Sequence, residues 1–111
     1  MTNVSFYIED LDPGSVVAIA RRGALVQMGG EARERVRASR GRVEAMIEGS
    51  LTVYGVTTGF GALANTRIAA DQRLELQSSL LRSHAAGMGP FLQPEVVRAM
   101  MAIRARTLAA G

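Results

Sequence analysis

A glycine-rich stretch at residues 54–61, Tyr-Gly-Val-Thr-Thr-Gly-Phe-Gly, limits the folds open to this chain most strongly. Three glycines in eight residues cannot continue a regular helix or strand. Each permits backbone conformations that are closed to other residues, or lets a second chain or a ligand approach closely. Helical patterns lie on both sides of the stretch. We therefore predict a fixed loop, with one phenol at its head, inside a mainly α-helical body.

The chain before this loop predicts a small β element. Residues 4–8 alternate weakly and predict a short strand, and residues 24–28 predict a second. Between them, Asp12 has the position of a helix N-cap and Pro13 that of the first helical residue, ahead of a helix over 15–22. Gly23 is placed to end that helix in the left-handed conformation. We expect its buried side to comprise Val16, Val17, Ile19 and Ala20. The two strands are predicted to pair, and a parallel arrangement is one option.

Three longer helices are predicted. The first opens after Gly29-Gly30 and runs over 31–48. Asp71 can cap the second, which runs to about residue 86 and is apolar over so wide an arc that we expect it to be buried on more than one side. The third begins at Pro94 and continues to about residue 108, still apolar on one side. An apolar side without a partner predicts that the chain is either a truncated piece of a larger protein or a subunit that assembles with another chain.

These elements predict a mainly α fold with a small β element, organised as one segment. Its parts are a strand–helix–strand region over 1–30, a helix over 31–50, a loop region over 51–70 and two helices over 71–111. A chain of 111 residues has room for one domain and one core.

Composition excludes several classes of protein. With no cysteine, the chain has no disulfide framework, thiol nucleophile or cysteine zinc site, which is typical of a cytoplasmic protein. No apolar run approaches the ~18 residues of a membrane span, and no signal peptide pattern is present. All 13 basic residues are arginine, and five of them, at positions 33–42, are interleaved with glutamates. That pattern favours a solvated or subunit-facing helix, so nucleic-acid binding is the weakest alternative.

The sequence offers few residues that could form a catalytic or metal site. One histidine and scattered carboxylates predict no metal site, and the loop lacks both the lysine of a phosphate loop and the glycine spacing of a dinucleotide fingerprint. What remains is Tyr54 together with Ser83 and His84. A phenol acts as a base near neutral pH only if its pKa is lowered well below ~10, and the loop's amides could contribute to that. The structural alternatives are a core tyrosine with a satisfied hydroxyl and a helix-end histidine favoured by the helix dipole.

Residues 54–61 resemble the signature of the aromatic amino-acid lyase family, which includes histidine, phenylalanine and tyrosine ammonia-lyases and the related aminomutases. Thr57 stands where the family usually has Asn. The resemblance continues through 76–90, Leu-Gln-Ser-Ser-Leu-Leu-Arg-Ser-His-Ala-Ala-Gly-Met-Gly-Pro, and through 103–111, Ile-Arg-Ala-Arg-Thr-Leu-Ala-Ala-Gly. It covers the chain from about residue 50 onward, and the first 50 residues are compatible with it. It implies the N-terminal segment of the L-aspartase-like (ammonia-lyase) fold.

The resemblance also implies roles for four residues. Tyr54 occupies the position of the tyrosine that removes a proton from the β-carbon of the substrate. Gly61 corresponds to a loop residue beside the substrate, and Ser83 and His84 fall on the position that selects the substrate's side chain. Histidine ammonia-lyases commonly have Ser-His there, as do some tyrosine aminomutases. The implied substrate is an amino acid, with L-histidine favoured.

One departure from the family is large. The family's electrophile, a methylidene-imidazolone (MIO), forms from an internal Ala-Ser-Gly, and this sequence has no such triplet. Family enzymes are also longer homotetramers whose active sites lie between subunits. We therefore predict an N-terminal part or split subunit of a histidine ammonia-lyase-like enzyme, oligomeric and inactive alone. Its partner would be the remainder of the lyase chain or a complementary subunit. The alternatives are a tyrosine or phenylalanine ammonia-lyase or aminomutase segment, and a non-catalytic truncated homologue that acts as a protein-interaction module.

Overall fold

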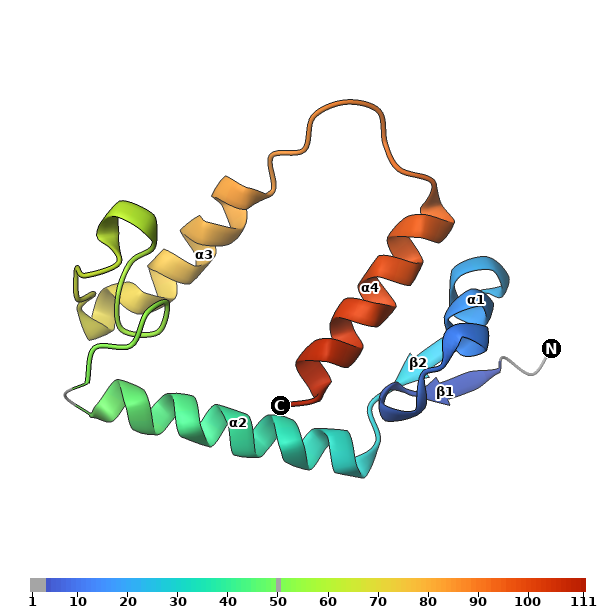
Figure 1. Cartoon of the computed structure of the whole chain (residues 1–111), viewed down its shortest axis with the longest axis horizontal. Helices are drawn as coiled ribbons and strands as arrows, with labels where there is room; N and C mark the ends of the chain where they lie inside the picture. The colour runs from blue at the N-terminus through green and yellow to red at the C-terminus, as the bar shows by residue number, and fades with distance from the viewer. Residues whose placement is uncertain (1–3, 50) are drawn as a thin grey trace. The chain divides into compact units, whose positions relative to one another are not determined.

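The computed structural model of the chain describes residues 4–49 and 51–111. Its α-helices are α1 (Pro13–Arg22), α2 (Gly30–Glu48), α3 (Arg73–His84) and α4 (Pro94–Ala109), as Figure 1 shows. The strands are β1 (Ser5–Tyr7) and β2 (Leu25–Gln27), and single 3-10 turns are η1 (Ile8–Asp10), η2 (Gly61–Leu63) and η3 (Ala70–Gln72). The predicted mainly α fold with a small β element is confirmed. Positions 1–3 and 50, which bound two of the predicted regions, lie outside the described residues.

The chain divides into two compact units. Residues 1–40 and 91–111 form one, called here the terminal unit, and residues 41–90 form the other, called the loop unit. The organisation as a single lyase segment stays a prediction. All four candidate site residues belong to the loop unit.

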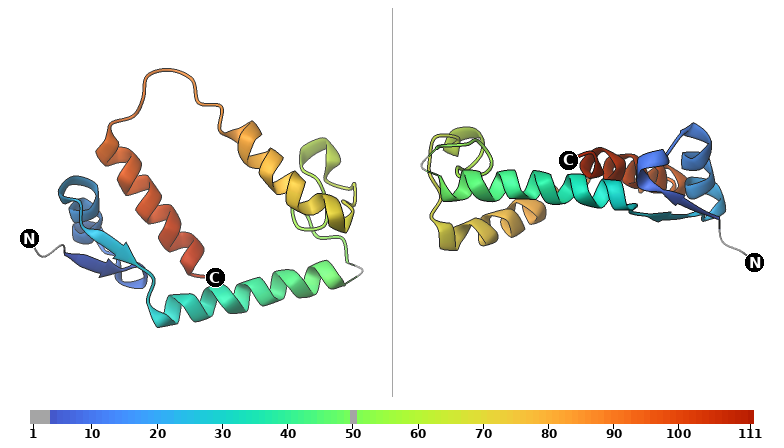
Figure 2. Two further views of the ribbon diagram at one scale, coloured as in Figure 1. Left: turned by 180° about the vertical axis from the view of Figure 1, so that it is seen from behind. Right: turned by 90° about the horizontal axis from the view of Figure 1, so that it is seen from below.

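The terminal unit is built on a parallel pair of strands. β1 pairs with β2 in the register Ser5–Leu25, Phe6–Val26 and Tyr7–Gln27, and α1 makes the crossover between them. The two views of Figure 2 show the strands side by side. The predicted strand pairing is therefore confirmed, in its parallel form.

Helix α1 begins with a reciprocal pair of hydrogen bonds. Asp12 Oδ1 accepts a hydrogen bond from the Ser15 backbone N–H at 2.7 Å, and Ser15 Oγ accepts one from the Asp12 N–H at 2.8 Å. This capping box satisfies two amides that the first turn leaves unpaired. The Ser15 amide bonded to the carboxylate is the main reason that the pKa of Asp12 lies below its ordinary value. The predicted N-cap is confirmed, and Pro13 is the first residue of the helix, as predicted.

The core of the terminal unit comes from segments far apart in the sequence. Its buried apolar side chains come from η1 and the residue after it, from α1, from the first turn of α2 and from α4: Ile8, Leu11, Ile19, Ala32, Ala102 and Ala109. Three of these residues are alanines, and their small side chains let the helix backbones approach closely, so that the core is densely packed. The core therefore joins segments that are distant in the sequence. The apolar pattern of α1 predicted only part of it.

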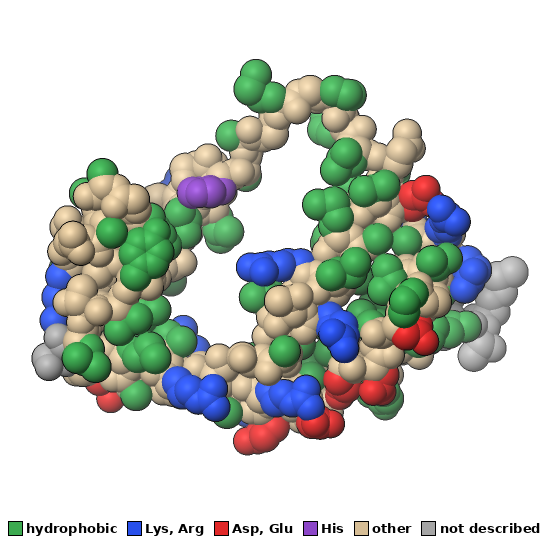
Figure 3. Space-filling model, in the orientation of Figure 1, with side chains coloured by type: hydrophobic (Ala, Val, Ile, Leu, Met, Phe, Trp, Pro, Cys, Tyr) green, Lys and Arg blue, Asp and Glu red, His purple; other side chains and the backbone are tan. Residues whose placement is uncertain are grey.

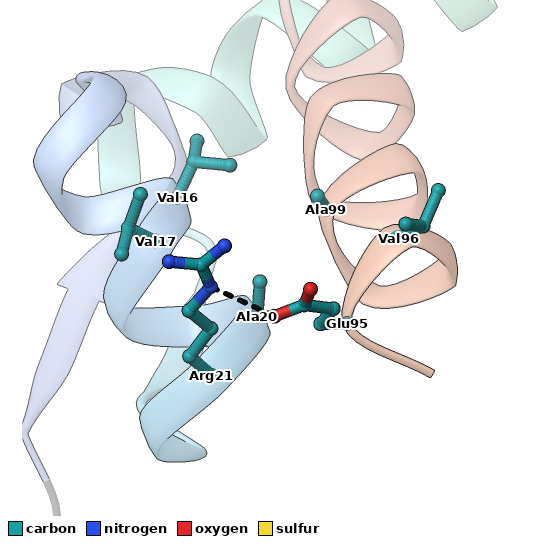
Figure 4. Close-up of a pocket in the computed structure, with 7 residues that line it drawn as sticks. All are labelled: Val16, Val17, Ala20, Arg21, Glu95, Val96 and Ala99. Carbon is teal, nitrogen blue, oxygen red and sulfur yellow. Dashed lines mark hydrogen bonds and ion pairs between the residues drawn. The ribbon is translucent and has the colours of Figure 1, made fainter. Parts of the chain in front are cut away.

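Two residues predicted to be buried in α1 are not. Val17 is 41% exposed and Val16 is half-buried, whereas Ala18, Ile19 and Ala20 are buried. Figure 4 shows the reason: both valines border an open groove of about 220 Å³ between α1 and α4. The other residues that line it are Ala20, Arg21, Glu95, Val96 and Ala99. Arg21 Nε and Glu95 Oε2 form an ion pair across it at 2.7 Å.

Helix α2 begins beside a carboxylate of η1. Glu9 Oε2 accepts a hydrogen bond from the Gly29 N–H at 3.1 Å, immediately before the helix starts. A negative charge is favourable at a helix N-terminus because the first amides point toward it. The pKa of Glu9 lies below its ordinary value, chiefly because of its own backbone N–H, with the amides of Gly29 and Ala32 adding to the effect.

Candidate active site

The loop that carries Tyr54 is held by two buried hydroxyls. Thr57 and Thr58 are 0% and 1% exposed. Thr57 Oγ1 accepts a hydrogen bond from the Val53 N–H at 2.8 Å. Thr58 Oγ1 accepts one from the Gly55 N–H at 3.2 Å and donates to the Gly59 carbonyl at 2.9 Å. The side chains therefore replace the backbone ladder that a helix or strand would supply.

The backbone amides of the loop are also bonded inside the loop unit. The N–H groups of Val56 and Thr57 donate to the Val53 carbonyl at 3.1 and 2.9 Å. The Gly59 N–H donates to the Thr66 carbonyl at 3.1 Å, and the Ile68 N–H donates to the Thr57 carbonyl at 2.9 Å. These hydrogen bonds fix the shape of the loop.

Two glycines are required by the geometry of the loop. Gly55 has φ of 72°, and a Cβ there would lie 3.0 Å from Phe60 Cε1. A Cβ on Gly59 would lie 2.6 Å from Leu63 Cβ, closer than real Cβ atoms approach, and 3.0 Å from the Leu63 carbonyl oxygen. Gly55 thus provides a left-handed turn, and Gly59 allows the chain to cross itself closely. The predicted fixed loop is confirmed in the loop unit.

The ring of Tyr54 is packed on one side, whereas the residue remains largely exposed. Its ring meets Phe60 edge to face, with ring centroids 5.6 Å apart and an interplanar angle of 82°. The residue is nevertheless 62% exposed, and within the described part of the chain its hydroxyl has no hydrogen-bond partner. The alternative of a core tyrosine with a satisfied hydroxyl is therefore wrong for this chain. Gly61 begins η2 seven residues later, exposed and with φ of 57°.

Ser83 and His84 lie together at the end of α3. Ser83 Oγ donates a hydrogen bond to the Leu80 carbonyl at 2.9 Å, and it lies 3.1 Å from His84 Nδ1. His84 Nδ1 is also 2.9 Å from the Leu80 carbonyl. Both side chains are exposed. His84 is the last residue of α3, the position that the helix-end alternative predicts, and its substrate contact stays a prediction.

The structure brings some of the candidate residues together and not others. Ser83 and His84 are in direct contact, whereas residues 4–49 and 51–111 show no interaction that joins Tyr54 to either of them. The sequence singled out neither Thr58 nor the Leu80 carbonyl. A signal for both was present, because the side chains of serine and threonine commonly bond to backbone groups a few residues away.

Helix α3 differs from its prediction. No residue of it is buried, and Leu74 and Leu81 are 80% and 73% exposed. Figure 3 shows hydrophobic side chains at the molecular surface over this part of the chain. Asp71 does not cap the helix: it lies in η3, and the N-cap is Gln72 without a side-chain hydrogen bond. Of the apolar residues in the helix, Leu76 and Leu80 are half-buried and none is fully buried, so the expected burial on more than one side is wrong.

The residues present do not fit the family's electrophile. No Ala-Ser-Gly occurs in the sequence, and Ala38-Ser39-Arg40 is the nearest approach to it.

In the described part of the chain, no group of three or more histidine, aspartate or glutamate side chains could hold a metal ion. No helix over residues 4–49 and 51–111 combines the length and apolarity needed to cross a membrane.

The fold is that of the ammonia-lyases and aminomutases. The solved structure of tyrosine aminomutase from Streptomyces globisporus matches 99% of this chain with a TM-score of 0.86 and 35% sequence identity, over 21% of that chain. The sequence profile of the aromatic amino acid lyase family matches residues 11–111. The chain belongs to that family.

The most similar relatives include histidine ammonia-lyases. That of Streptomyces avermitilis is 49% identical over 96 residues, which are 86% of this chain and 19% of the relative. The probable histidine ammonia-lyase of Halobacterium salinarum is 48% identical over 103 residues, which are 93% of this chain and 20% of the relative. The chain thus corresponds to a short N-terminal segment and spans about a fifth of the length of these relatives.

Proposed function

We propose that this chain supplies the base and the side-chain-binding residues of a histidine ammonia-lyase active site. The reaction is the non-oxidative loss of ammonia from L-histidine to give urocanate. The observation that carries the proposal is the identity of 48–49% to histidine ammonia-lyases over 86% or more of the chain. The exposure of Tyr54 on a fixed loop supports it.

Each of the four residues has a role in this proposal. Tyr54 Oη takes a proton from the β-carbon of the substrate, and the electron pair of that C–H bond forms the double bond as ammonia leaves the α-carbon. Gly61, which has no side chain, leaves room beside the loop for the substrate. His84 contacts the imidazole of the substrate, and Ser83 lies beside His84 in the side-chain-binding position. A base fixed by buried hydrogen bonds loses little freedom when substrate binds, which favours proton transfer.

The proposal requires a partner. The methylidene-imidazolone supplies the family's electrophilic chemistry, and this chain cannot form it because it lacks the Ala-Ser-Gly triplet. The electrophile would come from the remainder of a lyase chain or from a complementary subunit, in a cytoplasmic oligomer that serves histidine catabolism. We therefore expect the chain to be inactive alone.

Reconstitution tests this proposal. The chain is mixed with a polypeptide that carries the remaining family sequence, including Ala-Ser-Gly, and urocanate is followed by its absorbance. We expect turnover in the mixture only, and we expect Tyr54→Phe to lower kcat by about 10²- to 10⁴-fold, as loss of a general base does. The matched control is Tyr7→Phe, at the other tyrosine, which lies in β1 of the terminal unit. No turnover in the mixture, or full turnover without the partner, would overturn the proposal.

A second candidate is a tyrosine aminomutase segment. It is favoured by the match to the tyrosine aminomutase structure at 35% identity over 99% of the chain. Product analysis of the reconstituted mixture with L-histidine, L-tyrosine and L-phenylalanine separates the two. Urocanate from histidine supports the lyase, whereas a β-amino acid from tyrosine supports the aminomutase. A non-catalytic interaction module predicts assembly with the partner that Tyr54→Phe leaves unchanged, and no product from any of the three.

A further inference from the structure

The contacts around the Leu80 carbonyl restrict the protonation of His84. His84 Nδ1 lies 2.9 Å from that oxygen, within hydrogen-bond distance. A carbonyl oxygen only accepts hydrogen bonds, and a neutral imidazole carries one proton on one of its two nitrogens. The contact is therefore a hydrogen bond only when the proton is on Nδ1. A bare Nδ1 would instead place two lone pairs against each other.

The hydroxyl of Ser83 reinforces this arrangement. Ser83 Oγ donates to the Leu80 carbonyl at 2.9 Å, which uses its single proton. Its lone pairs then face His84 Nδ1 at 3.1 Å, where they can accept from an Nδ1–H. Both acceptors around Nδ1 thus demand the same proton position. The ring nitrogen left bare in the neutral imidazole is Nε2.

We propose that Ser83 and the Leu80 carbonyl hold His84 as its Nδ1–H tautomer, so that Nε2 is a hydrogen-bond acceptor for the substrate's side chain. Ser83 is then a positioning residue, and His84 selects side chains that bear a donor. The N–H of an imidazole and the O–H of a phenol meet that requirement, whereas a phenyl ring does not. This rests on the proposed function for its substrate, but the state of the imidazole is a property of the chain itself.

Nuclear magnetic resonance tests the tautomer directly, because the chain contains a single histidine. The full 111-residue chain is labelled with ¹⁵N and studied in alkaline solution, where imidazole is neutral. We expect the chemical shifts of a protonated Nδ1 and a bare Nε2, and a larger Nδ1–H population than in the same chain unfolded in urea. An Nε2–H tautomer, or the same tautomer balance with and without urea, would overturn the proposal.

Two serine variants locate the cause. Ser83→Ala removes one of the two acceptors around Nδ1, so the Nδ1–H population should fall toward the value in urea. Ser79→Ala, an exposed serine of the same helix, is the matched control and should leave it unchanged. If both variants leave the population unchanged, the positioning role of Ser83 is wrong. These spectra require no turnover, so they are independent of whether the lyase proposal holds.

Kinetics of the reconstituted enzyme test the acceptor. His84→Gln keeps an oxygen acceptor at the end of the side chain, whereas His84→Leu removes it. We expect His84→Leu to lower kcat/KM for L-histidine by about 10- to 100-fold more than His84→Gln, the scale for an unmade hydrogen bond. We also expect His84→Leu to lower kcat/KM for L-histidine far more than it lowers kcat/KM for L-phenylalanine. Equal losses in the two variants would overturn the acceptor role. If unmodified chain gives no turnover, the proposed function fails, and the spectra still decide the tautomer.

Discussion

The two units of the molecule are held in different ways. The terminal unit buries hydrocarbon from four segments that are distant in sequence, including Ile8, Ile19 and Ala102. In the loop unit the most deeply buried side chains are Thr57 and Thr58, whose hydroxyls are bonded to backbone within six residues. Packing therefore defines the terminal unit, whereas local hydrogen bonds define the loop. The apolar surface of α3 remains exposed.

This difference bears on function. A loop fixed by its own hydrogen bonds keeps its shape without a hydrocarbon core beneath it, so Tyr54 can stand on an exposed surface and still be oriented. An exposed apolar helix gains stability only when another surface covers it, since the hydrophobic effect scales with the area removed from water. The loop unit thus combines a fixed loop with an apolar helix that is largely exposed.

Truncation in the core should have the largest effect on the terminal unit. Ile19 is 8% exposed, so Ile19→Ala leaves a cavity and should lower the free energy of unfolding by about 2–4 kcal/mol. Denaturant unfolding measures this. Val17→Ala, in the same helix but 41% exposed, is the matched control. A loss at Ile19 no larger than at Val17 would show that packing does not hold this unit.

Removing one hydroxyl should have the next largest effect, in the loop unit. Thr57→Val keeps the shape of the side chain but leaves the Val53 N–H without its acceptor, at a cost of about 1–3 kcal/mol. Amide hydrogen exchange at Val53 should become faster. Thr57→Ser keeps the hydroxyl and should retain most of the protection. Unchanged exchange in the valine variant would contradict a loop held by hydrogen bonds.

Acid should weaken the terminal unit through Glu9. Because the pKa of this carboxyl is lowered on folding from its ordinary value of 4.5, its charged form stabilises the fold above that pH. The contribution is lost as the pH falls through the lowered pKa. Unfolding of the unmodified chain and of Glu9→Gln, followed at pH 7 and again below 4.5, should differ more at pH 7. Asp10→Asn serves as the control, and a pH-independent difference for Glu9→Gln would contradict the linkage.

The smallest effect is expected on the exposed face of α3. Leu81→Ala removes the same amount of hydrocarbon as a core truncation, yet the side chain is 73% exposed, so stability should change by no more than about 0.5 kcal/mol. Denaturant unfolding of this variant beside Ile19→Ala gives the direct contrast between the units. A loss at Leu81 as large as that at Ile19 would mean that α3 is covered in the chain.

Local signals in the sequence predicted most of the elements. Asp12-Pro13 marked the start of α1 and Gly23 marked its end, because caps depend on neighbours within a turn. The glycine-rich stretch predicted a fixed loop for the same reason. The family signature identified Tyr54 and the Ser83-His84 pair as candidates, and the family itself is confirmed. The roles of these residues stay predictions.

Most of the elements, the N-cap of α1, the family and the candidate residues could be predicted from the sequence alone, since each follows from local spacing or from a family motif. The three-dimensional structure was needed to show that the strands pair in parallel and that Val17 borders a groove. It also decided that α3 is exposed and that the loop's amides are used internally. Burial and hydrogen-bond partners depend on which segments meet in space, and a helical pattern shows an apolar face without showing what covers it. At Tyr54 the sequence thus supplied the phenol and its loop, and the fold decided that the hydroxyl stays open.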